Sequence, residues 1–295
     1  MTKWLGTRYR FHPLFILMML GSAVTGLFLE AATLFGVVLI HELGHVAAAK
    51  GFGWRVKEVQ LLPFGGVAVV EELGSVSARE ELLVALAGPL QHVWMMALAW
   101  AMQAVGAPGG DWWGYFWQVN AMIAMFNLLP ILPLDGGKVM MCLLSYAMSY
   151  HRAMVYSVWA SLVLSSGVVL AAIGQGVFGG AGSRLQLNLA VIGLFLLVSN
   201  WYALKQRQFH FMRFLMNRSL RAESLIGQGA LAQPIVVPKG RRIADVVKLL
   251  MRDKYHLIYV LGERGRIQAV VPEQQLVRGF LEGKKAGSAV SELFM

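Results

Sequence analysis

Long apolar segments are the feature that most constrains how this chain can fold. Six of them occupy residues 11–29, 31–49, 82–105, 119–132, 154–173 and 185–204. A helix that crosses a bilayer needs about 20 apolar residues, because its backbone must satisfy its own hydrogen bonds within the hydrocarbon. The composition agrees, since only 14% of the 295 residues are charged, whereas soluble domains carry about 25%. The sequence therefore predicts an α-helical polytopic membrane protein with six transmembrane helices.

Positively charged residues flank these segments unevenly. Three of them lie within the first ten residues, and a basic stretch from Lys205 to Arg221 follows the last apolar segment. The positive-inside rule places both flanks, and hence both termini, in the cytoplasm. Residues 206–225 are accordingly a predicted basic juxtamembrane linker, and its basic residues, Arg218 among them, close the sixth segment on the cytoplasmic side.

The net charge of +10 lies mainly at the C-terminal end of the chain. Residues 206–295 contain 15 Lys and Arg against 7 Asp and Glu. A basic region of this kind can meet nucleic acid or anionic lipid, but no nucleic-acid-binding motif accompanies it here. We therefore expect the lipid bilayer, and no nucleic acid, to be its partner.

One motif, HELGH at residues 41–45, lies inside the second apolar segment. On a helix His41 and His45 project from one face, so both imidazoles can bind one metal ion. Glu42 is close enough to reach a metal-bound water and act as general base. A chance match would leave these groups unpaired at membrane depth, at considerable cost, and a bound metal removes that cost. The motif predicts a metal-dependent hydrolase.

A third metal ligand must come from elsewhere, because a catalytic zinc normally takes three protein ligands. Cys142 is the only cysteine, so a Cys-rich site is excluded. Asp135 follows the fourth apolar segment, at the depth expected for His45. An aspartate before glycine is equally typical of a turn or a helix cap, so the spacing alone leaves both readings open.

Two other polar residues lie within apolar segments. His92 is either a rival ligand, a proton relay or a hydrogen-bonded core histidine, and the last reading is favoured. Asn127 can bind a substrate backbone or a developing oxyanion, although an interhelical hydrogen bond is the commoner role for such a residue.

Residues 56–72 interrupt the helical pattern. They are rich in valine and are broken by Pro63, Gly65 and Gly66, which predicts a β-hairpin. This hairpin is either a re-entrant loop whose strand edge binds an extended substrate or an ordinary cytoplasmic loop.

The C-terminal residues change character. They alternate short Val/Ile-rich strands with an amphipathic helix at residues 243–252, in β-α-β-β-α order. We expect a membrane domain at 1–205, the linker at 206–225 and a small α/β domain at 226–295. A single unit of this size has little core, so pairing with a second copy of the chain is expected.

Four motifs together resemble the site-2 protease family of intramembrane zinc metalloproteases: HELGH (41–45), PFGGVA (63–68), AGP (87–89) and NLLPILPLDGG (127–137). The six-segment layout with one C-terminal CBS-like module is similar to the sporulation branch of that family. The resemblance covers essentially the whole chain.

The resemblance implies a metalloendopeptidase. His41, His45 and Asp135 would bind one Zn²⁺, and Glu42 would activate the attacking water. Candidate substrate contacts, from the motifs and from the predicted strand edge, are Asn127, Pro133, Phe64, Gly65, Gly66 and Val67.

The sporulation branch also implies a substrate and partners. The substrate would be the membrane-associated pro-segment of a pro-sigma factor, cut in the outer forespore membrane facing the mother cell. Two inhibitory membrane proteins, of the stage IV sporulation protein FA and bypass-of-forespore protein A types, would be partners, and the CBS-like module would bind ATP. A membrane metal transporter or sensor with the same ligands, or a site-2 protease with another substrate, are the alternatives.

Two positions depart from the pattern of these relatives. His92 stands where many of them carry Asn. VVPEQQL (270–276) has Pro272 and Gln275 where CBS nucleotide sites usually end in Thr or Ser followed by Asp.

Overall fold

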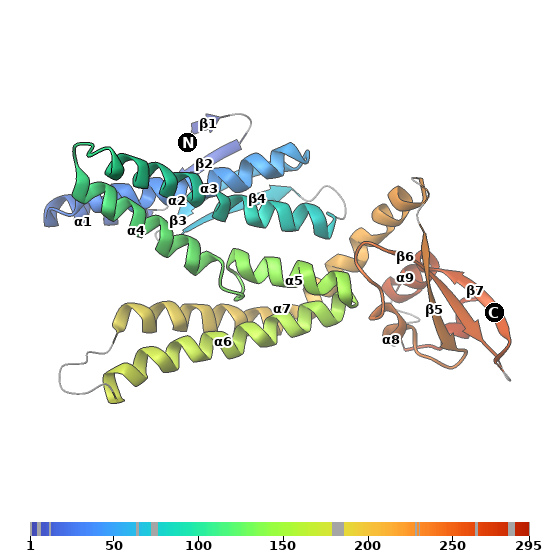
Figure 1. The fold of residues 1–295 in the computed structure, drawn as a ribbon. Helices are drawn as coiled ribbons and strands as arrows, with labels where there is room; N and C mark the ends of the chain where they lie inside the picture. Colours follow the sequence, from blue (N-terminus) through green and yellow to red (C-terminus); the bar gives the residue numbers. More distant parts are fainter. Residues whose placement is uncertain are drawn as a thin grey trace. The chain divides into compact units, whose positions relative to one another are not determined.

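The chain is mostly helical, with two small sheets (Figure 1). The computed structural model describes residues 2–4, 7–11, 13–62, 65–71, 76–178, 186–227, 229, 231–262, 265–282 and 287–294. These residues form two compact units. The first unit comprises Met1–Leu73 and Arg79–Val139, and the second comprises Gly74–Ala78 and Met140–Met295.

Five helices contribute to the first unit. They are α1 (Pro13–Thr25), α2 (Phe28–Gly51), α3 (Ala78–Ala104), α4 (Gly110–Asn127) and the start of α5 (Asp135–Ala147). Of these, α2 and α3 are long and apolar enough to cross a membrane. Helix α1 has 13 residues, and α4 begins nine residues before the predicted segment 119–132. The structure thus agrees with a helical membrane protein, while the count of six spans stays a prediction.

The first unit also contains a four-stranded sheet, in the order β1-β2-β3-β4. Its strands are β1 (Thr2–Trp4), β2 (Thr7–Phe11), β3 (Arg55–Leu62) and β4 (Gly65–Glu71). β3 and β4 are antiparallel and pair from Leu62↔Gly65 outwards, which confirms the predicted hairpin. The sequence pattern did not predict that the N-terminal β2 would pair in parallel with β3. Pro63 and Phe64 lie outside the described residues.

The second unit contains two long helices, α6 (Tyr150–Phe178) and α7 (Leu187–Gly227), and both include a segment able to cross a membrane. They pack along each other (Figure 1). Gly193 makes the contact close, because a Cβ there would lie 2.9 Å from the Val169 side chain. Helix α7 continues to residue 227, so the region predicted as a linker, 206–225, is helical.

The C-terminal residues form a three-stranded sheet with helices, in the β-α-β-β-α order predicted from the sequence. The elements are β5 (Ala232–Pro238), α8 (Ile243–Val247), β6 (Tyr255–Leu261), β7 (Ile267–Pro272), α9 (Glu273–Leu281) and the 3₁₀ helix η2 (Val290–Leu293). β6 is the central strand, parallel to β5 and antiparallel to β7. The hydrophobic core of this C-terminal module includes Ile258, Leu276 and, from α7, Leu215.

Helix α8 is shorter than the predicted helix 243–252. The backbone after Val247 leaves the helix, and the carbonyls of Met251 and Arg252 accept hydrogen bonds from Arg218 on α7. Arg252 in turn donates to the Val76 carbonyl, which explains why the segment before α3 belongs to the second unit.

Candidate metal centre

Two glycines bring α2 and α3 into close contact in the first unit. A Cβ on Gly44 of α2 would lie 2.6 Å from the Ala87 carbonyl oxygen. A Cβ on Gly88 of α3 would lie 2.7 Å from His41 Nε2 and would also overlap His45 Nε2. The glycine of the AGP motif therefore permits a close helix contact and leaves room beside the two histidines.

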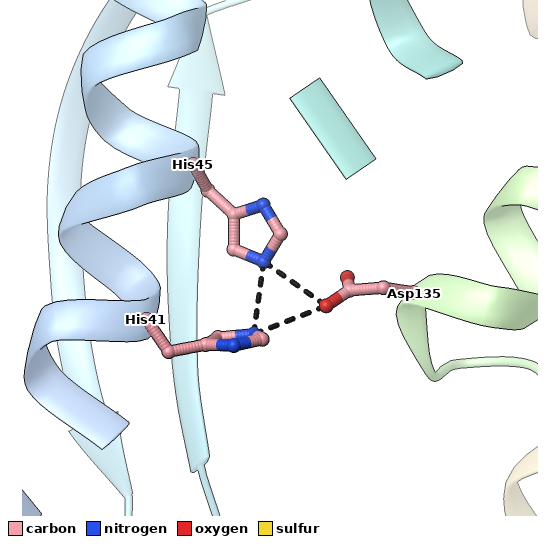
Figure 2. A group of neighbouring side chains, drawn as sticks. All are labelled: His41, His45 and Asp135. Atoms are coloured by element: carbon pink, nitrogen blue, oxygen red, sulfur yellow. Dashed lines mark hydrogen bonds and ion pairs between the residues drawn. The ribbon is translucent and has the colours of Figure 1, made fainter. Parts of the chain in front are cut away.

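The two histidines of HELGH lie one turn apart on α2 and face the same way, as the four-residue spacing predicts. Asp135, the first residue of α5, points at them from the opposite side (Figure 2). Its Oδ2 lies 3.1 Å from His41 Nε2 and 3.1 Å from His45 Nε2, and the two Nε2 atoms are 3.1 Å apart. His41 is 3% exposed and Asp135 is 4% exposed.

The turn before α5 places Asp135. Its backbone folds back so tightly that a Cβ on Gly136 would overlap the Leu128 carbonyl, and one on Gly137 would lie 2.5 Å from the amide nitrogen of Leu132. The two glycines of PLDGG thus permit this approach. The sequence left two readings open for Asp135, a metal ligand or a turn residue. The structure places its carboxylate beside the two histidines, where a metal ligand would lie.

Neighbouring groups fix which atoms face the centre of this cluster. His45 Nδ1 donates to the Val84 carbonyl at 2.7 Å, so its Nε2 presents a lone pair. Asp135 Oδ1 accepts from Lys138 Nζ at 3.1 Å, and Oδ2 is turned to the histidines. Acceptor atoms are therefore directed at one point from two sides.

Such a cluster suits a cation. Repulsion between acceptors at 3.1 Å is relieved by a positive ion between them. One ligand atom from each of His41, His45 and Asp135 can be chosen so that all lie within 4.8 Å of one another. Zinc–ligand bonds of about 2.0–2.1 Å in a tetrahedron give ligand–ligand distances of about 3.3 Å, close to the observed 3.1 Å. The nitrogen and oxygen donors present fit zinc.

Glu42 lies between the two histidines in sequence and is 9% exposed. Among the described residues of the first unit, Glu42 and Asp135 are the buried acids. Asp135 already faces the histidines with Oδ2. Glu42, which is adjacent to His41 in the sequence, is therefore the buried carboxylate left to serve as a base.

The predicted substrate-contact residues lie outside the three-residue cluster. Asn127 ends α4, and its Nδ2 donates to the Ile123 carbonyl of the same helix at 3.1 Å. Pro133 is exposed in the turn before Asp135, and residues 65–67 begin β4. Phe64 is outside the described residues, so nothing tests its predicted role.

Of the three readings given for His92, the favoured one, a hydrogen-bonded core histidine, is confirmed: His92 is buried, lies outside the metal cluster, and its Nε2 is 3.0 Å from His41 Nδ1. The sequence analysis did not predict that His92 and Lys138 contact the candidate ligands. The spacing offered a signal, since His92 follows Gly88 by four residues and must share its face of α3. Lys138 follows Asp135 by three residues and gave the same kind of signal.

Comparisons with known proteins found a matching family model and several similar sequences. The model of peptidase family M50 matches residues 29–109. Stage IV sporulation protein FB of Bacillus subtilis is 33% identical over 305 aligned positions, covering 100% of this chain and 99% of that protein. A zinc metalloprotease of Methanocaldococcus jannaschii is 32% identical over 123 residues, 41% of this chain and 35% of that one.

A solved structure shares the fold. The site-2 protease from Methanocaldococcus jannaschii superposes with a TM-score of 0.51 and 22% identity, over 69% of this chain and 93% of that one.

Proposed function

Because this chain belongs to peptidase family M50, the site-2 proteases, we propose that His41, His45 and Asp135 bind the zinc ion of an intramembrane metalloendopeptidase. The family membership makes the chain a zinc metalloprotease of the membrane. The assignment of ligands is supported by the convergence of their three donor atoms at 3.1 Å.

Each residue has a distinct task in this proposal. A zinc ion bound here would polarise the scissile carbonyl and lower the pKa of the attacking water. Glu42 takes the proton of that water and delivers it to the leaving nitrogen. Lys138 keeps the Asp135 carboxylate turned toward the histidines, because it holds the other carboxylate oxygen.

The substrate is proposed to bind as an extended strand. Peptide carbonyls in a transmembrane helix are occupied by hydrogen bonds, so a scissile segment must unwind before it is attacked. β4 is the outer strand of its sheet as far as the described strands go, and its start, at residues 65–67, can pair with such a segment. Asn127 and Pro133 are proposed to hold the peptide, together with Phe64.

The proposed substrate is the membrane-associated pro-segment of a pro-sigma factor cut during bacterial sporulation. The full-length similarity to a stage IV sporulation protein supports this choice over other membrane substrates. The proposal includes six spans with both termini cytoplasmic, in the outer forespore membrane, and inhibitory partners of the two types named above. No observation favours the transporter alternative.

The C-terminal module is proposed as a CBS-like regulatory domain that pairs with a second copy. The β-α-β-β-α order and the small size of the module support this. We do not extend the proposal to ATP binding. Residues 270–276 lack the Thr/Ser–Asp ending of CBS nucleotide sites, and the Glu273 carboxylate within them is bound by Arg218 and His256.

Co-expression with a pro-sigma factor tests the proposal, with the cleaved product scored by mass. Glu42→Gln should keep zinc and lower cleavage by about 10²–10⁴-fold. Glu30→Gln, at the exposed start of the same helix, is the matched control and should cleave normally. Equal cleavage by wild type and Glu42→Gln would contradict the proposed mechanism, and loss of zinc in Glu42→Gln would assign this residue another role.

A further inference from the structure

Three buried polar side chains, one from each of three helices, form a hydrogen-bonded chain that ends on a proposed zinc ligand. They are Asn120 on α4, His92 on α3 and His41 on α2. We propose that Asn120 and His92 are positioning residues that hold His41 in the one tautomer able to bind zinc. This inference rests on the zinc site proposed above, and it assigns a task to two residues that lie outside the metal cluster.

The direction of the chain is set at its far end. Asn120 Nδ2 lies 2.8 Å from the Phe116 carbonyl oxygen of its own helix. A carbonyl oxygen can only accept, so the NH₂ side of the amide must face it. The Asn120 Oδ1 is then turned to His92, at 2.8 Å from Nδ1.

The next two protons follow from that orientation. Because Asn120 Oδ1 can only accept, His92 must carry its hydrogen on Nδ1, and its Nε2 presents a lone pair. That lone pair lies 3.0 Å from His41 Nδ1, which must therefore be the protonated nitrogen of His41. The remaining nitrogen, His41 Nε2, is left unprotonated and faces His45 and Asp135 at 3.1 Å.

Burial makes the chain a strong constraint. His92 and Asn120 are both 0% exposed, so solvent cannot replace a lost partner. An apolar cluster from the same three helices, Val37, Met95 and Val119, packs in this unit. A hydrogen bond to the outer nitrogen of a metal-binding histidine fixes its ring and raises its basicity.

The three proposed ligands differ in how they are held. His45 is oriented by a main-chain carbonyl, which no side-chain substitution removes. Asp135 is oriented by Lys138, whose side chain is 45% exposed. His41 alone depends on a buried side chain, and on a second side chain behind it. Among the described residues, substitution of His92 or Asn120 should therefore disturb His41 without changing any member of the metal cluster.

The test measures zinc affinity of the full-length, detergent-solubilised protein by competition with a chelator. His92→Leu should weaken zinc binding by about 10–100-fold, the usual effect of losing such an outer partner. His92→Gln should recover most of the affinity, because its amide oxygen can accept from His41 Nδ1 and its NH₂ can donate to Asn120. Met95→Leu, equally buried on the same helix, controls for packing and should bind zinc as the wild type does.

A second arm tests the order of the chain. Asn120→Leu should weaken zinc binding on its own, since His92 is then free to take the other tautomer. In the His92→Leu background the same change should have almost no further effect, because Asn120 acts only through His92. Independent, multiplicative losses would contradict the chain.

Thermal unfolding of the zinc-free protein separates positioning from packing. If His92→Leu and His92→Gln lower the unfolding temperature of the zinc-free protein equally and leave zinc affinity unchanged, the two residues only join helices and the inference is wrong. The proposed function fails separately: a wild-type protein that binds no zinc, or a Glu42→Gln variant that still cleaves, overturns that proposal whatever the His92 variants do.

Discussion

Each unit contains a buried cluster of histidine and carboxylate groups at hydrogen-bonding distance, and the two clusters differ in where their positive charge comes from. In the second unit, Arg218 Nη2 lies 2.9 Å from Glu273 Oε2, which is also 3.0 Å from His256 Nδ1. The other cluster, His41, His45 and Asp135, has no arginine. Its lysine contacts only the outer carboxylate oxygen of Asp135.

The cluster in the second unit is self-contained. Arg218 neutralises Glu273 and also donates to the carbonyls of Met251 and Lys254, so one guanidinium joins α7 to the segment before β6 and to α9. The charges balance within the protein, which is the pattern of a structural ion pair, although Arg218 Nε and Glu273 Oε1 are buried without a hydrogen-bond partner among the described residues. The histidine–aspartate cluster instead directs acceptors at one another and fits a cation supplied from outside the chain. Both clusters contain histidine and carboxylate groups, so residue types alone do not distinguish a structural ion pair from a candidate metal site. The direction of the lone pairs distinguishes them.

The largest expected effect is on the His41, His45 and Asp135 cluster, which fits an external cation. Asp135→Ala removes one of three proposed ligands. Loss of an outer partner lowers zinc affinity by about 10–100-fold, and loss of a ligand should lower it further. The zinc-free form should be no less stable than the wild type, because the substitution also removes repulsion between facing acceptors. Chelator competition and thermal unfolding measure the two quantities. A variant that keeps its zinc, or that unfolds much more easily when metal-free, would place Asp135 in a structural role.

The opposite pattern is expected for the self-contained cluster. Arg218→Ala leaves the buried Glu273 without its counter-charge, which should cost about 3–5 kcal/mol of stability in this region. Amide hydrogen exchange in β6 and α9 of the full-length protein should accelerate accordingly, while zinc affinity stays unchanged. The exposed Arg213→Ala on the same helix is the control. Unchanged exchange in Arg218→Ala would show that the ion pair contributes little.

The two clusters also differ in how much of each could be predicted from the sequence. The face shared by His41 and His45 follows from helical periodicity, so it was predictable from five residues. Asp135 is 94 positions from His41 and depends on a turn whose two glycines fold back on residues 128–132, so spacing alone left its role open.

Arg218 shows the limit of such reasoning. Its place in a basic stretch predicted only the cytoplasmic flank of the last apolar segment, and not that its side chain would be 3% exposed. Its partner Glu273 is 55 positions away and belongs to no motif, so no local pattern identifies the pair. The same limit applies to β2, whose pairing with β3 joins segments separated by two helices. Local periodicity predicts elements, and contacts distant in sequence remain invisible to it.

A smaller effect is expected from Gly88→Ala, which adds one methyl group beside the proposed ligands. A Cβ there would lie 2.7 Å from His41 Nε2 and overlap His45 Nε2, so the rings or the helix must shift. We expect zinc affinity to fall by about tenfold, because ligand geometry is displaced while all ligands remain. Gly36→Ala on α2, where a Cβ meets nothing within 4 Å, is the matched control. Equal zinc affinity in both variants would mean that the α2–α3 contact is more adaptable than its packing indicates.

The smallest expected effect is the pH dependence of stability in the second unit, which follows from the pKa of Glu273. Burial by itself raises the pKa of Glu273, but hydrogen bonds from His256 and Arg218 and the Arg218 charge outweigh it, so the pKa lies below its ordinary value of 4.5. A lowered carboxyl pKa stabilises the folded state above the unfolded pKa, and this stability is lost as pH falls through the folded pKa.

Hydrogen exchange of β6, corrected for its intrinsic pH dependence, should therefore accelerate as pH falls below about 4.5. Glu273→Gln should lower stability at neutral pH and reduce this acceleration, because the titrating group is gone. The exposed Glu282→Gln should leave the pH dependence as it is in the wild type. If Glu273→Gln keeps the full acid response, the stability of this module depends on other carboxylates, and the Arg218–Glu273 pair is not the charge-balanced counterpart of the metal cluster.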